Sequence, residues 1–254
     1  MINWDEFNEI CKLRDSGRPA EALEKLERLV CSDDEERATV LLHQSLCHRN
    51  MGKLDRTIQA TMSALDLLPA ESACRPFAEF CLAGSYESAG NFEQAAAGFR
   101  AFLQDHAELL KAEDLISLKS DAQHHLATVL IMLKQYHEAL FLLEAIEPLA
   151  SGDELAEVHY RKGLAHQFLG KEQLALESFR QALAGHLNSQ FVSRAHFAIG
   201  EILYATGELS TALAEFELAI QHCEQGSTDL TAYTNWLSET RKHLLQRRLP
   251  TKVM

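Results

Sequence analysis

Histidine and cysteine are the residues in this sequence that could bind a metal ion. A tetrahedral site on helices takes four ligands, commonly in pairs three or four residues apart. His43 and Cys47 have that spacing, but no second such pair lies nearby and no C-x-x-C motif occurs. The adjacent His124 and His125 point to different sides of a helix. The sequence therefore predicts no metal and no cofactor. The cysteines are expected to be small, mostly buried thiols in a reducing compartment: Cys11, Cys31, Cys47, Cys74, Cys81 and Cys223.

Two further patterns resemble catalytic motifs. Gly163, Gly170 and Lys171 suggest a phosphate-binding loop, but that loop has four residues between its glycines and a Ser or Thr after the Lys, where this chain has Glu172. No G-x-S-x-G motif of a nucleophile elbow occurs. A Cys or Ser nucleophile could still meet a distant histidine, which the sequence leaves open. We expect a protein without enzymatic activity.

Composition and charge limit the kind of protein further. Only five prolines and twelve glycines occur in 254 residues, and 46% of the residues are hydrophobic, which favours an all-α fold with a buried core. The formal charge of -13 argues against binding to nucleic acid, whose phosphates attract Lys and Arg. The acidic start of the chain does not resemble a signal peptide, and no segment has the apolar length of a membrane span. We expect a soluble, cytoplasmic protein.

A short phrase recurs along the chain and indicates a repeat. It consists of a Gly or its substitute, four residues, an Ala or its substitute, three residues and a large apolar residue. Successive copies begin 35, 38, 44, 36 and 37 residues apart. The six copies begin at Gly17, Gly52, Gly90, Lys134, Gly170 and Gly207.

These residues resemble the tetratricopeptide repeat family, whose pattern is W-x2-L-G-x2-Y followed by A-x3-F and later A and P. The Trp position is never filled by Trp, and Thr57 and Thr61 replace the Ala and the aromatic residue in the second copy. The resemblance covers residues 3 to 226 and is clearest in the last four copies. The matching residues there are Leu82, Ala83, Tyr86, Ala95, Phe99, Leu126, Ala127, Ala139, Leu143, Gly163, Ala175, Phe179, Ala182, Gly200, Ala212, Phe216 and Ala219.

The resemblance implies a right-handed superhelical solenoid of about six helix-turn-helix repeats in one domain over residues 1–248. An apolar stripe through Leu230, Tyr233, Leu237 and Leu244 predicts a capping helix over 228–248, since a terminal repeat otherwise leaves an interface exposed. A short basic tail follows at 249–254, and the cations from Arg241 onward are interpreted as complements of the helix dipole. The repeats are expected near 3–36, 38–71, 76–109, 120–153, 156–189 and 193–226.

Local signals place the helix ends. Ser32 with Glu35 and Ser151 with Glu154 have the spacing of capping boxes, and Ser227 follows Gly226 at an expected turn between helices. Small residues are expected where paired helices cross, with a large Phe or Leu one turn on. The greater spacing between the third and fourth copies, through 105–120, is expected to lengthen the helices there.

The resemblance implies that a protein or peptide partner binds a groove lined by the first helix of each repeat. Some relatives bind the C-terminal tails of chaperones through a basic carboxylate clamp. Binding of that kind is not expected here, because the Asn and Lys residues of the clamp are missing. The cationic and aromatic side chains of the expected site predict a ligand with acidic and apolar groups. In one alternative, Arg161 and Arg194 only offset acidic neighbours. In another, the partner binds the 109–118 region. The chain is expected to be an adaptor, or alternatively a sensor of a signalling peptide; its oligomeric state stays open. The residues of the expected site are His124, Thr128, Tyr160, Arg161, Leu164, Gln167, Arg194, Phe197, Glu201 and Tyr204.

Overall fold

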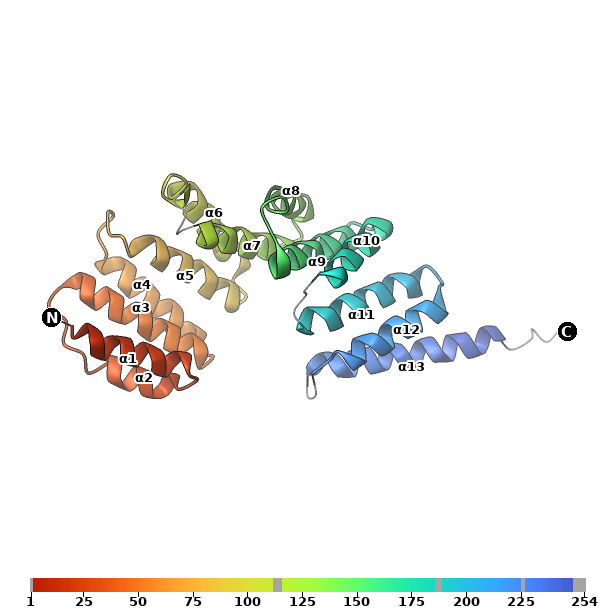
Figure 1. Cartoon of the computed structure of the whole chain (residues 1–254), viewed down its shortest axis with the longest axis horizontal. Helices are drawn as coiled ribbons and strands as arrows, with labels where there is room; N and C mark the ends of the chain where they lie inside the picture. The colour runs from red at the N-terminus through yellow and green to blue at the C-terminus, as the bar shows by residue number, and fades with distance from the viewer. Residues whose placement is uncertain (1, 112–115, 186–188, 225–226, 249–254) are drawn as a thin grey trace. The chain divides into compact units, whose positions relative to one another are not determined.

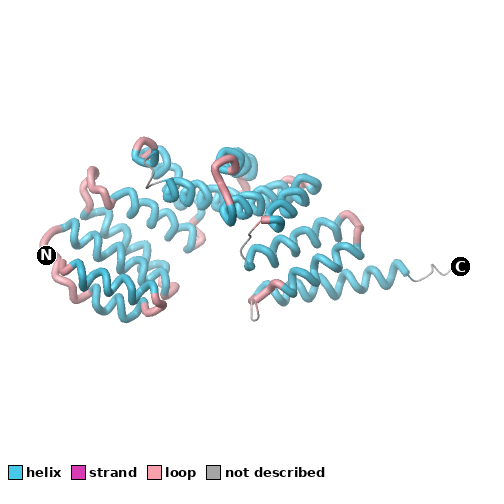
Figure 2. Tube along the Cα trace, viewed as in Figure 1, coloured by secondary structure: helices cyan, strands magenta, loops and turns pink. Residues whose placement is uncertain are grey.

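A computed structural model describes residues 2–111, 116–185, 189–224 and 227–248. Within these ranges the chain forms thirteen α-helices and one short 3-10 helix, and no strand (Figures 1 and 2). The predicted all-α fold class is confirmed.

The chain divides into two compact units, Met1–Leu133 and Lys134–Met254. The one-domain boundary at 1–248 stays a prediction. The first unit contains α1 (Trp4–Asp15), α2 (Pro19–Leu26), α3 (Asp34–Asn50), α4 (Leu54–Leu67), α5 (Arg75–Ser88), α6 (Phe92–Asp105), the 3-10 helix η1 (Leu109–Lys111) and α7 (Ile116–Met132). The second unit contains α8 (Tyr136–Ile146), α9 (Gly152–Phe168), α10 (Glu172–Ala184), α11 (Ser189–Ala205), α12 (Leu209–Gln221) and α13 (Thr228–Arg248).

The recurring glycine closes the turn inside a hairpin. After α5, Gly90 has a φ of +76°, and the N–H of Asn91 donates to the carbonyl oxygen of Tyr86 at 2.9 Å. A residue in the left-handed conformation after the helix lets the following N–H groups donate to the unpaired carbonyl oxygens of the last turn. Gly takes that conformation without a steric cost. Lys134 occupies the same place before α8 with a φ of +62°. The structure therefore confirms the phrase as a helix–turn–helix signal.

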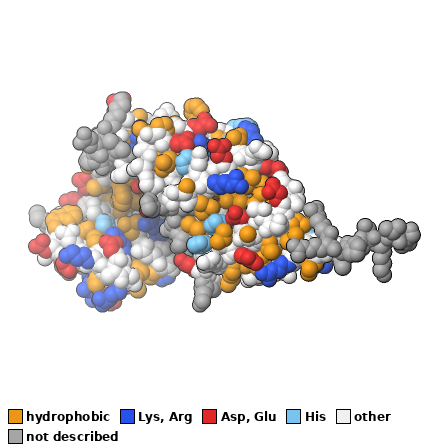
Figure 3. All heavy atoms as spheres, turned by 45° about the vertical axis from the view of Figure 1, so that its right-hand side comes forward, with side chains coloured by type: hydrophobic (Ala, Val, Ile, Leu, Met, Phe, Trp, Pro, Cys, Tyr) orange, Lys and Arg blue, Asp and Glu red, His pale blue; other side chains and the backbone are white. Residues whose placement is uncertain are grey.

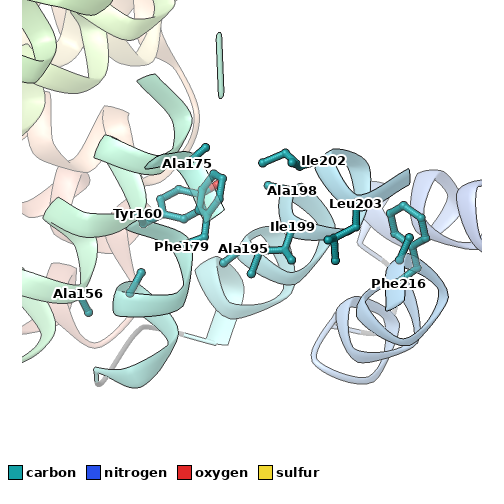
Figure 4. Close-up of a cluster of buried hydrophobic side chains, with 12 residues drawn as sticks. Ala156, Tyr160, Ala175, Phe179, Ala195, Ala198, Ile199, Ile202, Leu203 and Phe216 are labelled. Atoms are coloured by element: carbon teal, nitrogen blue, oxygen red, sulfur yellow. The ribbon is translucent and has the colours of Figure 1, made fainter. Parts of the chain in front are cut away.

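Close helix crossings explain why small residues recur within the hairpins. A Cβ atom added to Gly163 would lie 2.6 Å from the ring of Phe179, and one added to Gly200 would lie 2.6 Å from the ring of Phe216. Ala175 has no exposed surface on the facing helix, and Figure 4 shows it beside the rings of Tyr160 and Phe179. The expected pairing of small residues with a large aromatic is therefore confirmed in the second unit.

The connection between α6 and α7 differs from the expectation. Helix α6 ends at Asp105 and has 14 residues, as α4 and α5 have, so the predicted lengthening of α6 is wrong. The start of α7 stays untested, because residues 112–115 lie outside the described residues. In the described part of the link, the 3-10 helix η1 contacts α7, and His106 at the end of α6 contacts α5. Leu110 is buried in the 3-10 turn, and the ring of His106 contacts the carboxylate of Glu79 at 2.7 Å. Such tertiary contacts override helix propensity, which is a weak guide to helix ends.

The helix starts are partly as predicted. The N-cap of α3 is Asp33, whose carboxylate accepts from the N–H of Glu36 at 2.8 Å, so the predicted Ser32 and Glu35 box is wrong by one residue. Glu36 in turn accepts from the N–H of Ser32 at 2.7 Å. Ser151 is the N-cap of α9, as expected, but its side chain makes no capping hydrogen bond. Acidic residues at consecutive positions made the register ambiguous in the sequence.

The predicted capping helix is α13. It packs against α12, and Tyr233 is only 3% exposed. The hydroxyl of Ser227 accepts from the N–H of Asp229 at 3.3 Å at its start, where the sequence predicted a turn. Arg241 pairs with Glu217 of α12 at 2.8 Å. The expected basic tail at 249–254 lies outside the described residues.

Candidate partner-binding strip

Eight of the ten expected site residues lie on two neighbouring helices of the second unit, and we call these eight the strip. Helices α9 and α11 are in contact with each other, and the strip continues onto α13 through side-chain contacts of α11. Figure 3 shows basic, acidic and hydrophobic side chains interspersed on the visible face. The strip consists of Tyr160, Arg161, Leu164 and Gln167 on α9 and of Arg194, Phe197, Glu201 and Tyr204 on α11.

Both arginines of the strip are in ion pairs. The guanidinium of Arg161 donates to the carboxylate of Glu157, one turn earlier on α9, at 2.9 Å. The guanidinium of Arg194 donates to the carboxylate of Asp229 on α13 at 3.0 Å. These pairings remove the main reason to expect an acidic ligand, because each cation already has a carboxylate beside it.

Glu201 lies in a different environment. Its side chain is half-buried, and its carboxylate accepts a long hydrogen bond of 3.4 Å from the amide of Gln167 on α9. Burial raises the pKa of Glu201 above its ordinary 4.5, while the hydrogen bond from Gln167 acts in the opposite direction. Desolvation has this sign because it disfavours the charged form of a carboxyl group.

The aromatic residues of α11 pack against α13. The rings of Phe197 and Tyr233 are stacked with centroids 4.5 Å apart, and the ring of Tyr204 meets Trp236 edge to face at 5.1 Å. The hydroxyl of Tyr204 lies 2.5 Å from Nδ1 of His243. Phe197 and Tyr204 each retain some exposure, so they form the apolar part of the strip surface.

Tyr160 and Leu164 belong mainly to the core. Tyr160 is 6% exposed, and its ring lies 5.8 Å from Phe179 and 5.1 Å from Phe191. Burial raises the pKa of the Tyr160 hydroxyl to about 12. Leu164 packs against the same cluster. These two side chains support the strip from below and offer a partner little surface.

The other two expected site residues lie on α7 in the first unit. The side chain of His124 is 8% exposed. The hydroxyl of Thr128 donates to the backbone oxygen of His124 at 3.0 Å. These contacts give both side chains a role in packing and helix geometry.

The expected site residues did not include the continuation of the strip on α13. Hydrogen bonds join Arg194 to Asp229 and Tyr204 to Glu239, and each pair is 35 residues apart. The bond from Gln167 to Glu201 spans 34 residues. The repeat period, extended one step past the sixth copy, identifies these α13 residues. The α13 residues therefore follow the repeat period although α13 lacks the full repeat motif.

A hollow lies at the end of the strip, beside Tyr204. It has a volume of about 420 Å³ and is lined by Tyr204, Leu209, His243 and Gln246.

In the part of the chain that the structure describes, no group of three or more His, Cys, Asp or Glu side chains could hold a metal ion. No described helix has the length and apolarity that crossing a bilayer requires.

A cysteine and a histidine do meet in the first unit. Sγ of Cys11 lies 3.1 Å from Nδ1 of His43, and the Arg14 guanidinium lies 2.8 Å from the same nitrogen. Burial, aided by Arg14, lowers the pKa of His43 to about 4, and burial raises the pKa of the Cys11 thiol. Nucleophilic cysteines need the opposite arrangement, with a basic partner and a thiolate. The pair is a packing contact at the hydrophobic core formed by α1, α2 and α3 in the first unit.

Comparison with known proteins gives a family match and a shared fold. Residues 160–228 match the model of the tetratricopeptide repeat, and this segment contains all eight strip residues. A search of the curated proteins found no match.

Solved structures of repeat proteins have the same fold. MamA from Desulfovibrio magneticus RS-1 has a TM-score of 0.58 at 19% identity, over 73% of this chain and 94% of that chain. A thermophilic TPR protein from Thermus thermophilus has a TM-score of 0.58 at 20% identity, over 79% and 99%. BtubC from P. vanneervenii has a TM-score of 0.62 at 17% identity, over 84% and 90%. Together with the hairpin turns and the small-residue crossings, these comparisons show that residues 160–228 match the tetratricopeptide repeat and that the chain shares the fold of tetratricopeptide repeat solenoids.

Proposed function

We propose that the chain is a non-enzymatic protein-interaction module that binds a peptide or helical segment along the strip and its continuation on α13. The observation that carries the proposal is the placement of half-exposed polar and aromatic side chains next to one another on three packed helices. Gln167 of α9 bonds Glu201 of α11, and Tyr204 of α11 packs on Trp236 of α13. Rigid helices hold such groups in place better than loops do.

The chemistry of the described side chains supports binding rather than catalysis. The strip holds no activated nucleophile, and the Cys11–His43 pair of the first unit has pKa values shifted away from reactivity. Aromatic groups such as those of Phe197 and Tyr204 are among the residues that give affinity at protein interfaces. Function in this fold depends on such surface groups, since the fold itself specifies none.

Panning a phage-displayed library of random twelve-residue peptides on the full chain tests the proposal. We expect enriched peptides that bind with a 1:1 stoichiometry and a Kd of about 1 μM, the range of a modest interface. Tyr204→Ala should weaken the binding about tenfold or more, as loss of an aromatic anchor does. Arg180→Ala, on the exposed face of α10, is the matched control and should have no effect.

Circular dichroism and the melting temperature of both variants separate a binding defect from unfolding. If no peptide is enriched, or if the folded Tyr204→Ala variant binds as well as the parent, the strip is not the binding surface.

A further inference from the structure

The charge balance of the strip is acidic once its ion pairs are included. Helices α9 and α11 contribute two arginines, Arg161 and Arg194, and the carboxylates next to them are those of Glu157 and Asp229. Two more carboxylates remain, Glu201 and the Glu239 that accepts from the Tyr204 hydroxyl at 3.4 Å. Among these named groups, two cations face four carboxylates, which is a local excess of two negative charges.

Glu201 is a half-buried carboxylate for which the described residues supply no cation. Among the described residues, no Lys, Arg or His lies within ion-pair distance of Glu201; its one contact is the amide of Gln167. An ionised carboxylate in a half-buried position is incompletely solvated, and a neutral amide compensates this less than an opposite charge does. A cation brought by a partner would supply the missing interaction.

The surroundings of Glu201 fit a long basic side chain. Phe197 and Tyr204 lie four residues before and three residues after Glu201 on α11, so all three occupy one helix face. A Lys or Arg side chain lays its methylene stem on an apolar surface while its charged end reaches a polar group. Aromatic rings also attract such cations directly.

We propose that Glu201 recognises a Lys or Arg side chain of the partner, so that the strip selects basic peptides with neighbouring apolar residues. This inference rests on the proposed function, because it assigns the chemistry of the ligand to the same surface. It reverses the ligand charge that the arginines suggested in the sequence, since the structure satisfies those arginines internally.

The panning experiment tests this inference with three forms of the full chain. These are the parent, Glu201→Gln and the control Glu177→Gln, which removes the same charge from an exposed position on α10. The control matters because a chain of formal charge -13 attracts basic peptides without any specific site. We expect peptides selected on the parent and on Glu177→Gln to be enriched in Lys or Arg, and those selected on Glu201→Gln to lose this enrichment.

A double-mutant cycle on one selected peptide identifies the contact. Glu201→Gln should weaken binding of the parent peptide about tenfold. Replacing the critical Lys or Arg of the peptide by Met should weaken it by a similar factor, and the two changes together should add little to either alone. Glu177→Gln should leave the affinity within about twofold of the parent.

The outcomes separate the two proposals. Absence of any enriched peptide contradicts the binding function itself. Selected peptides rich in Asp or Glu, or basic peptides whose affinity does not depend on Glu201, would overturn the basic-ligand inference while leaving the binding function in place. Glu201→Gln is expected to fold, because it removes a partly desolvated charge and its amide can still bond Gln167.

Discussion

Replacing Gly98 by Ala should destabilise the α5–α6 hairpin, while the same change at Gly84 of that hairpin should stabilise it. A Cβ atom at Gly98 would lie 2.9 Å from Cβ and 3.4 Å from Cα of Ala83. Carbon atoms pack best at about 3.5–4.0 Å. Because Ala83 has no side chain that can rotate away, the helices themselves have to separate. At Gly84, nothing lies within 4 Å of an added Cβ.

The magnitudes decide the sign at each position. Replacing a helical Gly by Ala contributes about 0.8–1.0 kcal/mol through helix propensity. Overpacking a close contact costs about 1–3 kcal/mol. Gly84→Ala should therefore raise the free energy of unfolding by up to about 1 kcal/mol, and Gly98→Ala should lower it by up to about 2 kcal/mol. We expect the two variants to differ by about 1–3 kcal/mol.

Urea unfolding followed by circular dichroism at 222 nm measures this difference. Both substitutions lie in one hairpin, so they affect the unfolding of the same part of the protein. Equal m-values would show that both variants expose the same surface on unfolding, so that their free energies of unfolding can be compared directly. If Gly98→Ala stabilises the protein as much as Gly84→Ala does, the close approach of α5 and α6 does not limit the size of this residue.

Three further predictions concern the core, the pH dependence and the strip. Ala175→Trp should cost about 3 kcal/mol or more, because Ala175 has no exposed surface, whereas Gln104→Ala at an exposed position of α6 should change stability by less than about 0.5 kcal/mol; thermal melting checks both. Burial and Arg14 lower the pKa of His43 to about 4, so the unfolded chain binds a proton that the folded chain does not, and stability should fall by up to about 3 kcal/mol between pH 6.5 and 4. The urea midpoint of His43→Leu should fall less steeply over that range, and equal slopes would contradict the shift. Arg194→Glu places a carboxylate beside Asp229, so it should lower the melting temperature by a few degrees, while Arg194→Gln should have about half that effect; an unchanged melting temperature would show that the pair is unimportant in solution.

The helices and their turns could be predicted because their signals are local. Gly90 follows the end of α5 because the turn there needs a residue in the left-handed conformation. Glycines with positive φ recur at the same place in other hairpins along the chain. The apolar stripe of residues 230–244 predicted α13 for a similar reason. The capping residue of α3 was wrong by one position, because several neighbouring side chains could cap and only the backbone path selects Asp33.

The α6–α7 link and the strip depended on contacts between distant residues. Propensity favoured a longer α6, but α6 ends at Asp105, where His106 contacts Glu79 of α5 and Leu110 of the following 3-10 turn is buried. Tyr160 was expected to face a partner, and its ring lies instead in the core beside Phe179.

The sequence by itself determined the all-α class, the repeat period and the small residues at the crossings, since all of these follow from residue size and helical periodicity. Only the tertiary structure decided which charges remain available. Arg194 and Asp229 are 35 residues apart and meet because α13 packs beside α11, whereas Glu201 meets only an amide. Charge pairing depends on distances between helices, which no single helix encodes, so the partners of these charges could not be predicted from the sequence alone.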